Sequence, residues 1–124
     1  MSEKFVLIIE DNAAIGDVYA TTLDMINLRS EIITNGKDAL DRLDDIVPDL
    51  IMLDMNLPEV SGHYIYKKIR ADPRLHNCRV IVATANNLVA QMISKDLDRA
   101  DRLMMKPIAP RQLLDVVEAL SIER

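Results

Sequence analysis

Ionisable and hydroxyl side chains follow four of five short apolar runs in this sequence. Glu10 and Asp11 follow the first run, and Asp54, Thr84 and Lys106 follow the third, fourth and fifth. Three carboxylates held close together repel one another, and a divalent cation such as Mg²⁺, which prefers oxygen ligands, would relieve that repulsion. A carboxylate can also act as a nucleophile and form an aspartyl phosphate. With an ammonium and a hydroxyl to stabilise phosphoryl oxygens, the set predicts phosphoryl transfer.

Each of these residues, taken alone, has an ordinary structural explanation. Glu10 and Asp11 could cap a helix and interact with its dipole. Asp54 could be a turn residue, Thr84 a strand residue and Lys106 a surface lysine. Their joint occurrence at the ends of four of the five runs favours one shared chemistry.

The elements that would position these side chains follow a simple alternation. The apolar runs lie at residues 5–9, 31–34, 50–53, 80–83 and 103–105, with the second run weaker. The first, third and fourth are continuous, which is typical of strands buried on both faces of a parallel sheet. Helical spacing of three and four recurs between and after them, at Ile15, Tyr19, Leu23 and Ile26, at Ala39, Leu43 and Ile46, at Ile65 and Ile69, within residues 86–98, and at Leu113 and Val117. The pattern predicts an α/β fold of (βα)₅ type with helices on both faces of a parallel sheet, whose strand ends share one ligand-binding edge.

Composition narrows the class of protein. The 124 residues are 49% hydrophobic and 28% charged, which suits one globular domain over residues 1–124 without an output domain. The net charge of −5 argues against strong non-specific nucleic-acid binding. Cys78 is the one cysteine and lies in no zinc-like spacing, so we expect a reducing cytoplasm. The run at 5–9 is too short for a signal peptide or a membrane helix.

These motifs resemble the receiver domain of two-component response regulators over essentially the whole chain. Asp54 and Thr84 are thirty residues apart, and Thr84 and Lys106 are twenty-two apart, as the family pattern requires. The matching segments are Glu10-Asp11, Leu53-Asp54-Met55-Asn56-Leu57-Pro58 with Ser61-Gly62, Ala83-Thr84-Ala85, and Lys106-Pro107. The resemblance implies a flavodoxin-like sheet of order 2-1-3-4-5 and a cis bond before Pro107.

The resemblance also implies a role for each site residue. Asp54 would accept a phosphoryl group from a phosphohistidine of a sensor histidine kinase or a histidine phosphotransfer protein, and water would later remove it. Asp11, Asp54 and the backbone carbonyl of Asn56 would hold Mg²⁺ or Mn²⁺, with Glu10 acting mainly through water. Thr84 would bond one phosphoryl oxygen.

Lys106 would pair with another phosphoryl oxygen. The domain would assist its own phosphorylation and dephosphorylation without being an enzyme that turns over a separate substrate. Its output would be a changed interaction surface at the fourth helix, fifth strand and fifth helix, used for a homodimer or an output partner, with no nucleic acid or membrane bound by this domain.

Two positions depart from the family pattern. Leu103 stands where receivers usually carry a switching aromatic residue, so it is either a core leucine or a sign of altered coupling between phosphorylation and the last helix face. Arg99 replaces the glycine of a common Gly-Ala-Asp segment, which predicts a different end to the fourth helix. The remaining expectations are core positions for Met52, Met104, Met105 and Cys78, and surface positions for His63 and His76.

Three other functions compete with this interpretation. A flavodoxin-like flavoprotein would need a phosphate-cradling first loop, but Glu10-Asp11-Asn12 would repel phosphate without a metal, and aromatic residues make up only 3% of the chain. An aspartate-nucleophile phosphohydrolase would carry an Asp-x-Asp pair on the first strand and a cap domain. A degenerate receiver would serve only as an interaction module.

Overall fold

Five parallel strands form one sheet in the computed structural model, which describes residues 4–120 and 122. The strands are paired in the order β2-β1-β3-β4-β5, as predicted. They are β1 (Phe5–Ile9), β2 (Arg29–Ile33), β3 (Leu50–Asp54), β4 (Arg79–Thr84) and β5 (Arg102–Met105). The helices are α1 (Ala13–Asp24), α2 (Gly36–Leu43), α3 (Gly62–Ala71), α4 (Asn87–Ser94) and α5 (Pro110–Ala119), with a short 3₁₀ turn η1 (Pro73–Leu75).

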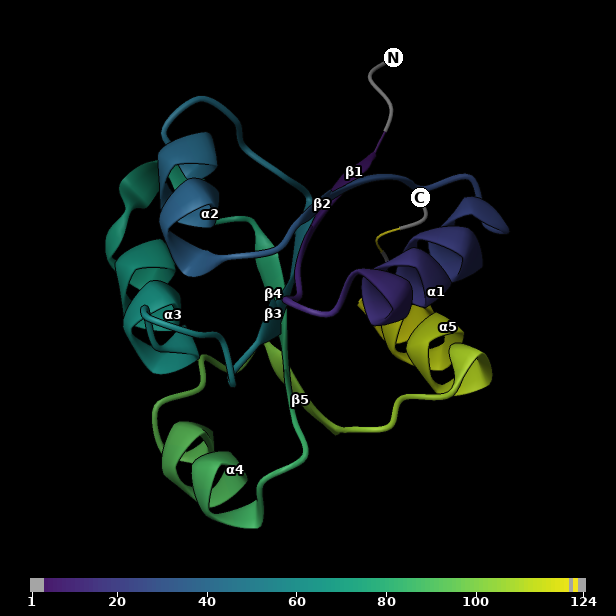
Figure 1. Cartoon of the computed structure of the whole chain (residues 1–124). Helices are drawn as coiled ribbons and strands as arrows, with labels where there is room; N and C mark the ends of the chain where they lie inside the picture. Colours follow the sequence, from purple (N-terminus) through teal and green to yellow (C-terminus); the bar gives the residue numbers. More distant parts are fainter. Residues whose placement is uncertain (1–3, 121, 123–124) are drawn as a thin grey trace.

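The helices cover both faces of the sheet, as predicted. Figure 1 shows α1 and α5 on one face and α2, α3 and α4 on the other. Side chains on alternate strand positions point to opposite faces, so the sheet separates two apolar clusters. Leu7, Ile51 and Ile65 belong to the cluster under α2, α3 and α4. Ile8 and Leu113 belong to the cluster under α1 and α5.

Polar caps start four of the five long helices directly after the strands. The side chains of Asn12, Asn35, Ser61 and Asn86 each accept a hydrogen bond from a backbone N–H in the first turn of α1, α2, α3 and α4. Such caps satisfy donors that the helix itself leaves unpaired. They keep the loops at the carboxyl ends of the strands short, which holds the candidate site residues near the sheet edge.

Several element bounds differ from the sequence prediction, and the periodic positions Ile26 and Ile46 lie beyond the ends of α1 and α2. β2 begins at Arg29 rather than at residue 31, because its pairing with β1 extends over half-buried and exposed positions that carry no apolar pattern. α4 ends at Ser94 rather than near residue 98. The backbone N–H of Asp98 instead donates to the hydroxyl of Tyr66, so the segment after α4 is held by another helix.

Most, but not all, of the predicted core positions are buried. Met52, Met104 and Cys78 are buried as expected. Met105 is 40% exposed, so its prediction as a core residue was wrong; it ends an edge strand, one position beyond the buried Met104. Leu103 is partly buried and packs against the cluster under α2, α3 and α4. Across residues 4–120 and 122, no helix has both the length and the apolar character needed to cross a membrane.

Candidate functional site

The carboxyl edge of the sheet gathers the residues singled out in the sequence. Glu10 and Asp11 follow β1, Asp54 ends β3, Thr84 ends β4 and Lys106 follows β5. The register places Asp54 opposite Ala83 and Thr84 opposite Met105, so β3, β4 and β5 end within one residue of the same level. The predicted convergence of these side chains is therefore present in the fold.

The centre of the site is an acidic cluster. One carboxylate oxygen each from Glu10, Asp11 and Asp54 lies within 4.8 Å of the other two. Glu10 and Asp54 are buried, whereas Asp11 is exposed. When all three are ionised, one neighbouring ammonium leaves an excess of negative charge. An all-oxygen donor set with this excess fits a hard divalent cation such as Mg²⁺.

Lys106 supplies that ammonium. Its Nζ lies 2.8 Å from Oε1 of Glu10 and 3.6 Å from Oδ1 of Asp54. Burial lowers the pKa of Lys106, but the hydrogen bond to Glu10 and the nearby carboxylates outweigh it, so the pKa lies above its ordinary value. The lysine therefore stays charged in the site.

Glu10 is held in place by two donors. Its carboxylate accepts hydrogen bonds from Lys106 and, at 3.2 Å, from the backbone N–H of Asn12. Burial nevertheless raises the pKa of Glu10 above its ordinary value, and the negative charge of Asp54 adds to the rise. A bound cation would favour the ionised form of this carboxylate.

The hydroxyl of Thr84 faces two asparagines that lie two positions beyond Asp54 and Thr84. The backbone N–H of Asn86 donates to Thr84 Oγ1 at 3.0 Å. The amide Nδ2 of Asn56 approaches the same oxygen at 3.4 Å, and the backbone N–H of Asn56 donates to Oδ1 of Asp54 at 3.0 Å. These contacts link the end of β3 to the end of β4.

Gly62 explains why α3 can begin so close to Asp54. A Cβ at this position would lie 2.6 Å from Cα of Met55 and 2.8 Å from the carbonyl oxygen of Asp54. Real Cβ atoms do not approach backbone atoms so closely, so any side chain at Gly62 would displace either α3 or the backbone that carries Asp54. The Ser61-Gly62 motif thus sets the position of the acidic cluster.

Tyr19 is a site residue that the sequence reasoning missed. It is 4% exposed and lines a small hollow with Glu10 and Asp54. It also lines a groove of about 400 Å³ beside Lys106. Burial raises the pKa of its phenol, and the charge of Lys106 opposes that rise. Its position in the apolar spacing of α1 identified it only as a core residue. The signal that could have found it is its phenol hydroxyl, a polar group on the face of the helix next to Glu10.

The groove beside Lys106 joins the first half of α1 to the loop after β5. Ile15 and Val18 of α1 lie on one side, and Pro107 and Ile108 on the other. The Lys106–Pro107 bond is cis, as predicted. A groove of about 490 Å³ between α2 and α3 is larger, but none of the acidic cluster lines it.

Comparison with known proteins places this chain in a family. The family model for the response regulator receiver domain matches residues 6–118. The probable transcriptional regulator ycf27 of Guillardia theta is 32% identical over 112 residues, which cover 90% of this chain and 43% of that protein. The chain spans about half, or less, of the length of the curated relatives that it matches.

Solved structures show the same architecture. A CheY-like receiver domain protein from Methanospirillum hungatei is 25% identical, with a TM-score of 0.84 and coverage of 98% of this chain and 97% of that one. The receiver domain of the sensor histidine kinase PA1611 from Pseudomonas aeruginosa has a TM-score of 0.83 at 21% identity, covering 96% of this chain and 98% of that one. That structure contains a magnesium ion coordinated in its active site cleft. On the match over residues 6–118, this chain belongs to the response regulator receiver domain family, a family of signalling domains of two-component systems.

Proposed function

We propose that this domain is a phosphoacceptor that takes a phosphoryl group on Asp54 from a phosphohistidine of a sensor histidine kinase or a histidine phosphotransfer protein. The observation that carries the proposal is the buried Asp54 carboxylate, which lies beside two further carboxylates and 3.6 Å from the Lys106 ammonium. Receiver-family membership supports the same chemistry. The chain, on this proposal, forms a single receiver domain that acts in the cytoplasm.

The proposed reaction is a direct transfer. A carboxylate oxygen of Asp54 forms a bond to phosphorus while the P–N bond of phosphohistidine breaks, and the electron pair of that bond returns to the imidazole nitrogen. Lys106 would neutralise one equatorial phosphoryl oxygen, and the Thr84 hydroxyl would donate a hydrogen bond to another. Water later attacks phosphorus, which restores the Asp54 carboxylate and releases inorganic phosphate. The domain assists both steps but turns over no separate substrate.

A divalent cation completes the proposed site. Asp11, Asp54 and the backbone carbonyl of Asn56 would hold Mg²⁺ or Mn²⁺, and Glu10 would contact it mainly through water. When bound, the cation supplies positive charge that offsets the carboxylates and the incoming phosphoryl oxygens. Magnesium in the active site cleft of the PA1611 receiver domain supports this assignment.

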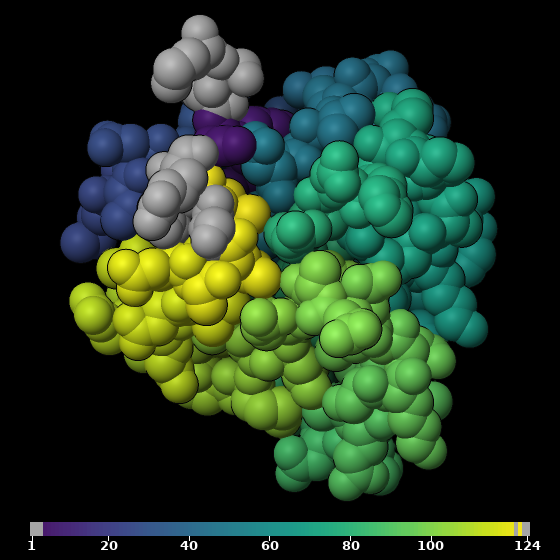
Figure 2. Space-filling model, turned by 180° about the vertical axis from the view of Figure 1, so that it is seen from behind, coloured from purple at the N-terminus to yellow at the C-terminus, as the bar shows by residue number. Residues whose placement is uncertain are grey.

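We further propose that α4, β5 and α5 carry the signal to a protein partner. Figure 2 shows these segments as one continuous surface, from the green atoms of α4 to the yellow atoms of α5. Leu88, Met92 and Met105 are exposed on it, and exposed apolar side chains of this size favour protein contacts. Sedimentation with and without beryllofluoride, a phosphoryl mimic, would show whether the partner is a second copy.

Phosphorylation by a small donor tests the central proposal. The protein is incubated with acetyl phosphate and Mg²⁺, and its intact mass is measured. We expect a gain of one phosphoryl group, which EDTA prevents. Asp54→Asn should abolish the gain, whereas Asp115→Asn, at an exposed aspartate on α5, should leave it unchanged. An adduct that survives Asp54→Asn, or none in the wild type, would overturn the proposal and leave the interaction-only function.

A further inference from the structure

The fourth helix is attached to the rest of the domain differently at its two ends. Figure 1 shows α4 on the same face of the sheet as α2 and α3. Only Ala90 and Ile93 of this helix are buried, whereas Leu88 and Met92 are 69% and 61% exposed. With so little apolar contact, the polar contacts at the two ends decide which part of α4 can move.

The N-terminal end of α4 is tied to the candidate site. Asn86 caps the helix, with its Oδ1 accepting from the N–H groups of Leu88 and Val89. The backbone N–H of the same residue donates to Thr84 Oγ1 at 3.0 Å. A Thr84 hydroxyl that turns toward a phosphoryl group would change this contact directly.

The segment after α4 is tied to α3 instead. Nε2 of His63, a partly exposed side chain, lies 2.7 Å from Oδ2 of Asp96. The backbone N–H of Asp98 donates to the Tyr66 hydroxyl at 2.8 Å. His63 and Tyr66 are three residues apart and therefore lie on the same side of α3. We call this pair of contacts the α3 clasp.

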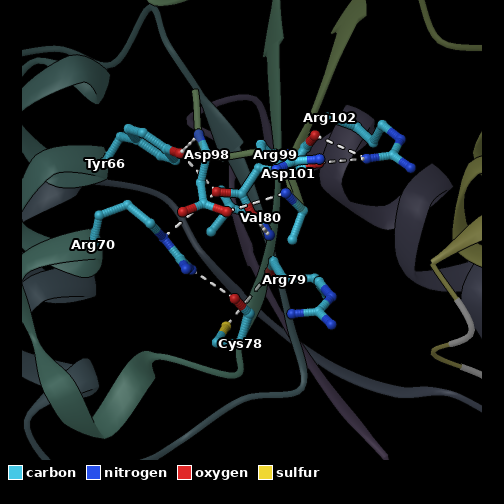
Figure 3. Close-up of polar contacts among 10 residues, drawn as sticks. Tyr66, Arg70, Cys78, Arg79, Val80, Asp98, Arg99, Asp101 and Arg102 are labelled. Atoms are coloured by element: carbon cyan, nitrogen blue, oxygen red, sulfur yellow. Dashed lines mark hydrogen bonds and ion pairs between the residues drawn. The ribbon is translucent and has the colours of Figure 1, made fainter. Parts of the chain in front are cut away.

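The Tyr66 half of the α3 clasp belongs to a network of polar contacts, which Figure 3 shows. Tyr66 is 1% exposed, and its hydroxyl donates to Oδ2 of Asp101 at 2.6 Å. Oδ1 of Asp101 accepts from the backbone N–H of Val80 at 2.9 Å, at the start of β4. Arg70 lies 3.5 Å from the same carboxylate and donates to the carbonyl of Cys78. Because buried polar groups are costly to leave unpaired, this network resists displacement.

The loop after α4 needs no glycine at position 99. Left-handed backbone, which a glycine there would favour, occurs among the described residues only at Asn27 and Glu59. The loop closes through side chains instead: Oδ1 of Asp98 accepts from the N–H of Ala100 at 3.1 Å, and Tyr66 holds the N–H of Asp98. The contact with α3 thus holds the loop in place without a glycine in left-handed conformation.

We propose that the α3 clasp makes the end of α4 a fixed pivot, so that phosphorylation moves residues 86–90 and leaves residues 95–101 in place. The inference rests on the proposed function, because it takes Thr84 as the group that responds to the phosphoryl. It also specifies the regulated surface. The first turn of α4, with Leu88, changes its position, while the loop before β5 stays bound to α3.

Backbone hydrogen exchange of the full chain tests the pivot. The exchange rates of individual amides are compared in the metal-free protein and with Mg²⁺ and beryllofluoride. In the wild type we expect changes at residues 54–56 and 84–90 and less than a twofold change at residues 95–101. In the double variant with His63→Gln and Tyr66→Phe, exchange at residues 95–101 should rise at least tenfold and should respond to beryllofluoride.

Matched controls separate the clasp from general destabilisation. Tyr64→Phe removes the hydroxyl of a tyrosine that is 52% exposed on the same helix, and His76→Gln changes the exposed second histidine. This double control should behave as the wild type. If the test variant fails to fold, His63→Gln alone, at the more exposed contact, should still raise exchange at residue 96 and its neighbours.

The outcomes distinguish the two proposals. A beryllofluoride response at residues 95–101 of the wild type equal to that at 86–90 would overturn the pivot and leave the phosphoacceptor function intact. Unchanged exchange at 95–101 in the variants would also overturn the pivot. No response at residues 54–56 would refute the proposed function. The α3 clasp would then be tested by comparing the metal-free exchange rates of the wild type and the double variant at residues 95–101.

Discussion

Replacing Asp54 with asparagine should stabilise the metal-free protein, because the charge of this buried side chain is poorly compensated. The side chain is 2% exposed, so its ionised form has lost most of its hydration. Asparagine has nearly the same shape and retains an oxygen that can accept from the N–H of Asn56. The substitution therefore removes the charge and leaves the local hydrogen bond in place.

The magnitude follows from the distances. With an effective dielectric constant of about 20, repulsion between Asp54 and Glu10, which offer carboxylate oxygens within 4.8 Å of each other, costs at least about 3.5 kcal/mol. Attraction to Lys106 at 3.6 Å contributes about 4.6 kcal/mol by the same relation. These two contributions nearly cancel, and the exposed Asp11 adds a weaker repulsion. Relief of the desolvation penalty, several kcal/mol for a buried ion, then decides the sign, and we expect a net gain of about 1–2 kcal/mol.

Urea unfolding measures this gain. The chain lacks tryptophan, so far-ultraviolet circular dichroism is the suitable signal, and the free energy of unfolding comes from linear extrapolation. Mg²⁺ at ten times its dissociation constant should stabilise the wild type by about 1.4 kcal/mol through binding linkage. The variant lacks one of the charged ligands proposed for Mg²⁺, so it should gain less than half of that.

A control variant shows whether the change in stability is specific to the acidic cluster. Asp41→Asn removes a charge from an exposed carboxylate on α2, whose partner Lys37 lies 3.3 Å away. It should change stability by less than about 0.5 kcal/mol and respond to Mg²⁺ as the wild type does. Destabilisation of the metal-free protein by Asp54→Asn, or stabilisation of this variant by Mg²⁺ as large as that of the wild type, would contradict a poorly compensated charge at Asp54.

Three further outcomes are expected. Gly62→Ala should lower the free energy of unfolding in urea by about 1–3 kcal/mol, because the added Cβ overpacks against backbone. In Gly16→Ala the added Cβ would meet only the Ile32 side chain, at 3.0 Å, so its free energy of unfolding should lie within about 1 kcal/mol of that of the wild type. The pKa of Glu10 is raised above its ordinary value of 4.5 in the folded protein, so protonated Glu10 favours folding below pH 4.5, and this contribution is lost as the pH rises through the raised pKa. Because protonation removes the charge of Glu10, Mg²⁺ titrations should show an affinity that falls on acidification from above pH 4.5. Burial raises the pKa of Cys78 to about 12, and the side chain is 2% exposed, so iodoacetamide at pH 8 should modify it only after unfolding, and rapid modification of the native protein would contradict this.

Strands with both faces covered could be predicted well from the sequence. The runs at residues 50–53 and 80–83 are continuous because helices cover both sides of β3 and β4. The start of the edge strand β2 was harder to predict, because Ser30 and Glu31 are only half-buried. The pairing of Arg29 with Phe5 is not marked by any apolar pattern in the local sequence. Likewise, α4 ends at Ser94, and the segment after it is held by a hydrogen bond that the backbone N–H of Asp98 donates to the Tyr66 hydroxyl, thirty-two residues away, which no window of local sequence contains.

The site shows the same division. The proximity of strand-end residues such as Asp54 and Thr84 could be predicted from the topology alone, because parallel strands share one carboxyl edge. Individual contacts could not be predicted. Lys106 lies closer to Glu10, ninety-six residues away, than to Asp54, and only the three-dimensional arrangement decides that preference.

The sheet that separates the two apolar clusters also has an evolutionary consequence. The groove beside Lys106, with Ile15 and Val18 of α1, lies on one side, and the α3 clasp lies on the other. Substitutions at sites that share no packing partner usually act independently on stability. A lineage could therefore accumulate substitutions in the groove and in the α3 clasp in separate steps, with the effect of each on stability largely independent of the other.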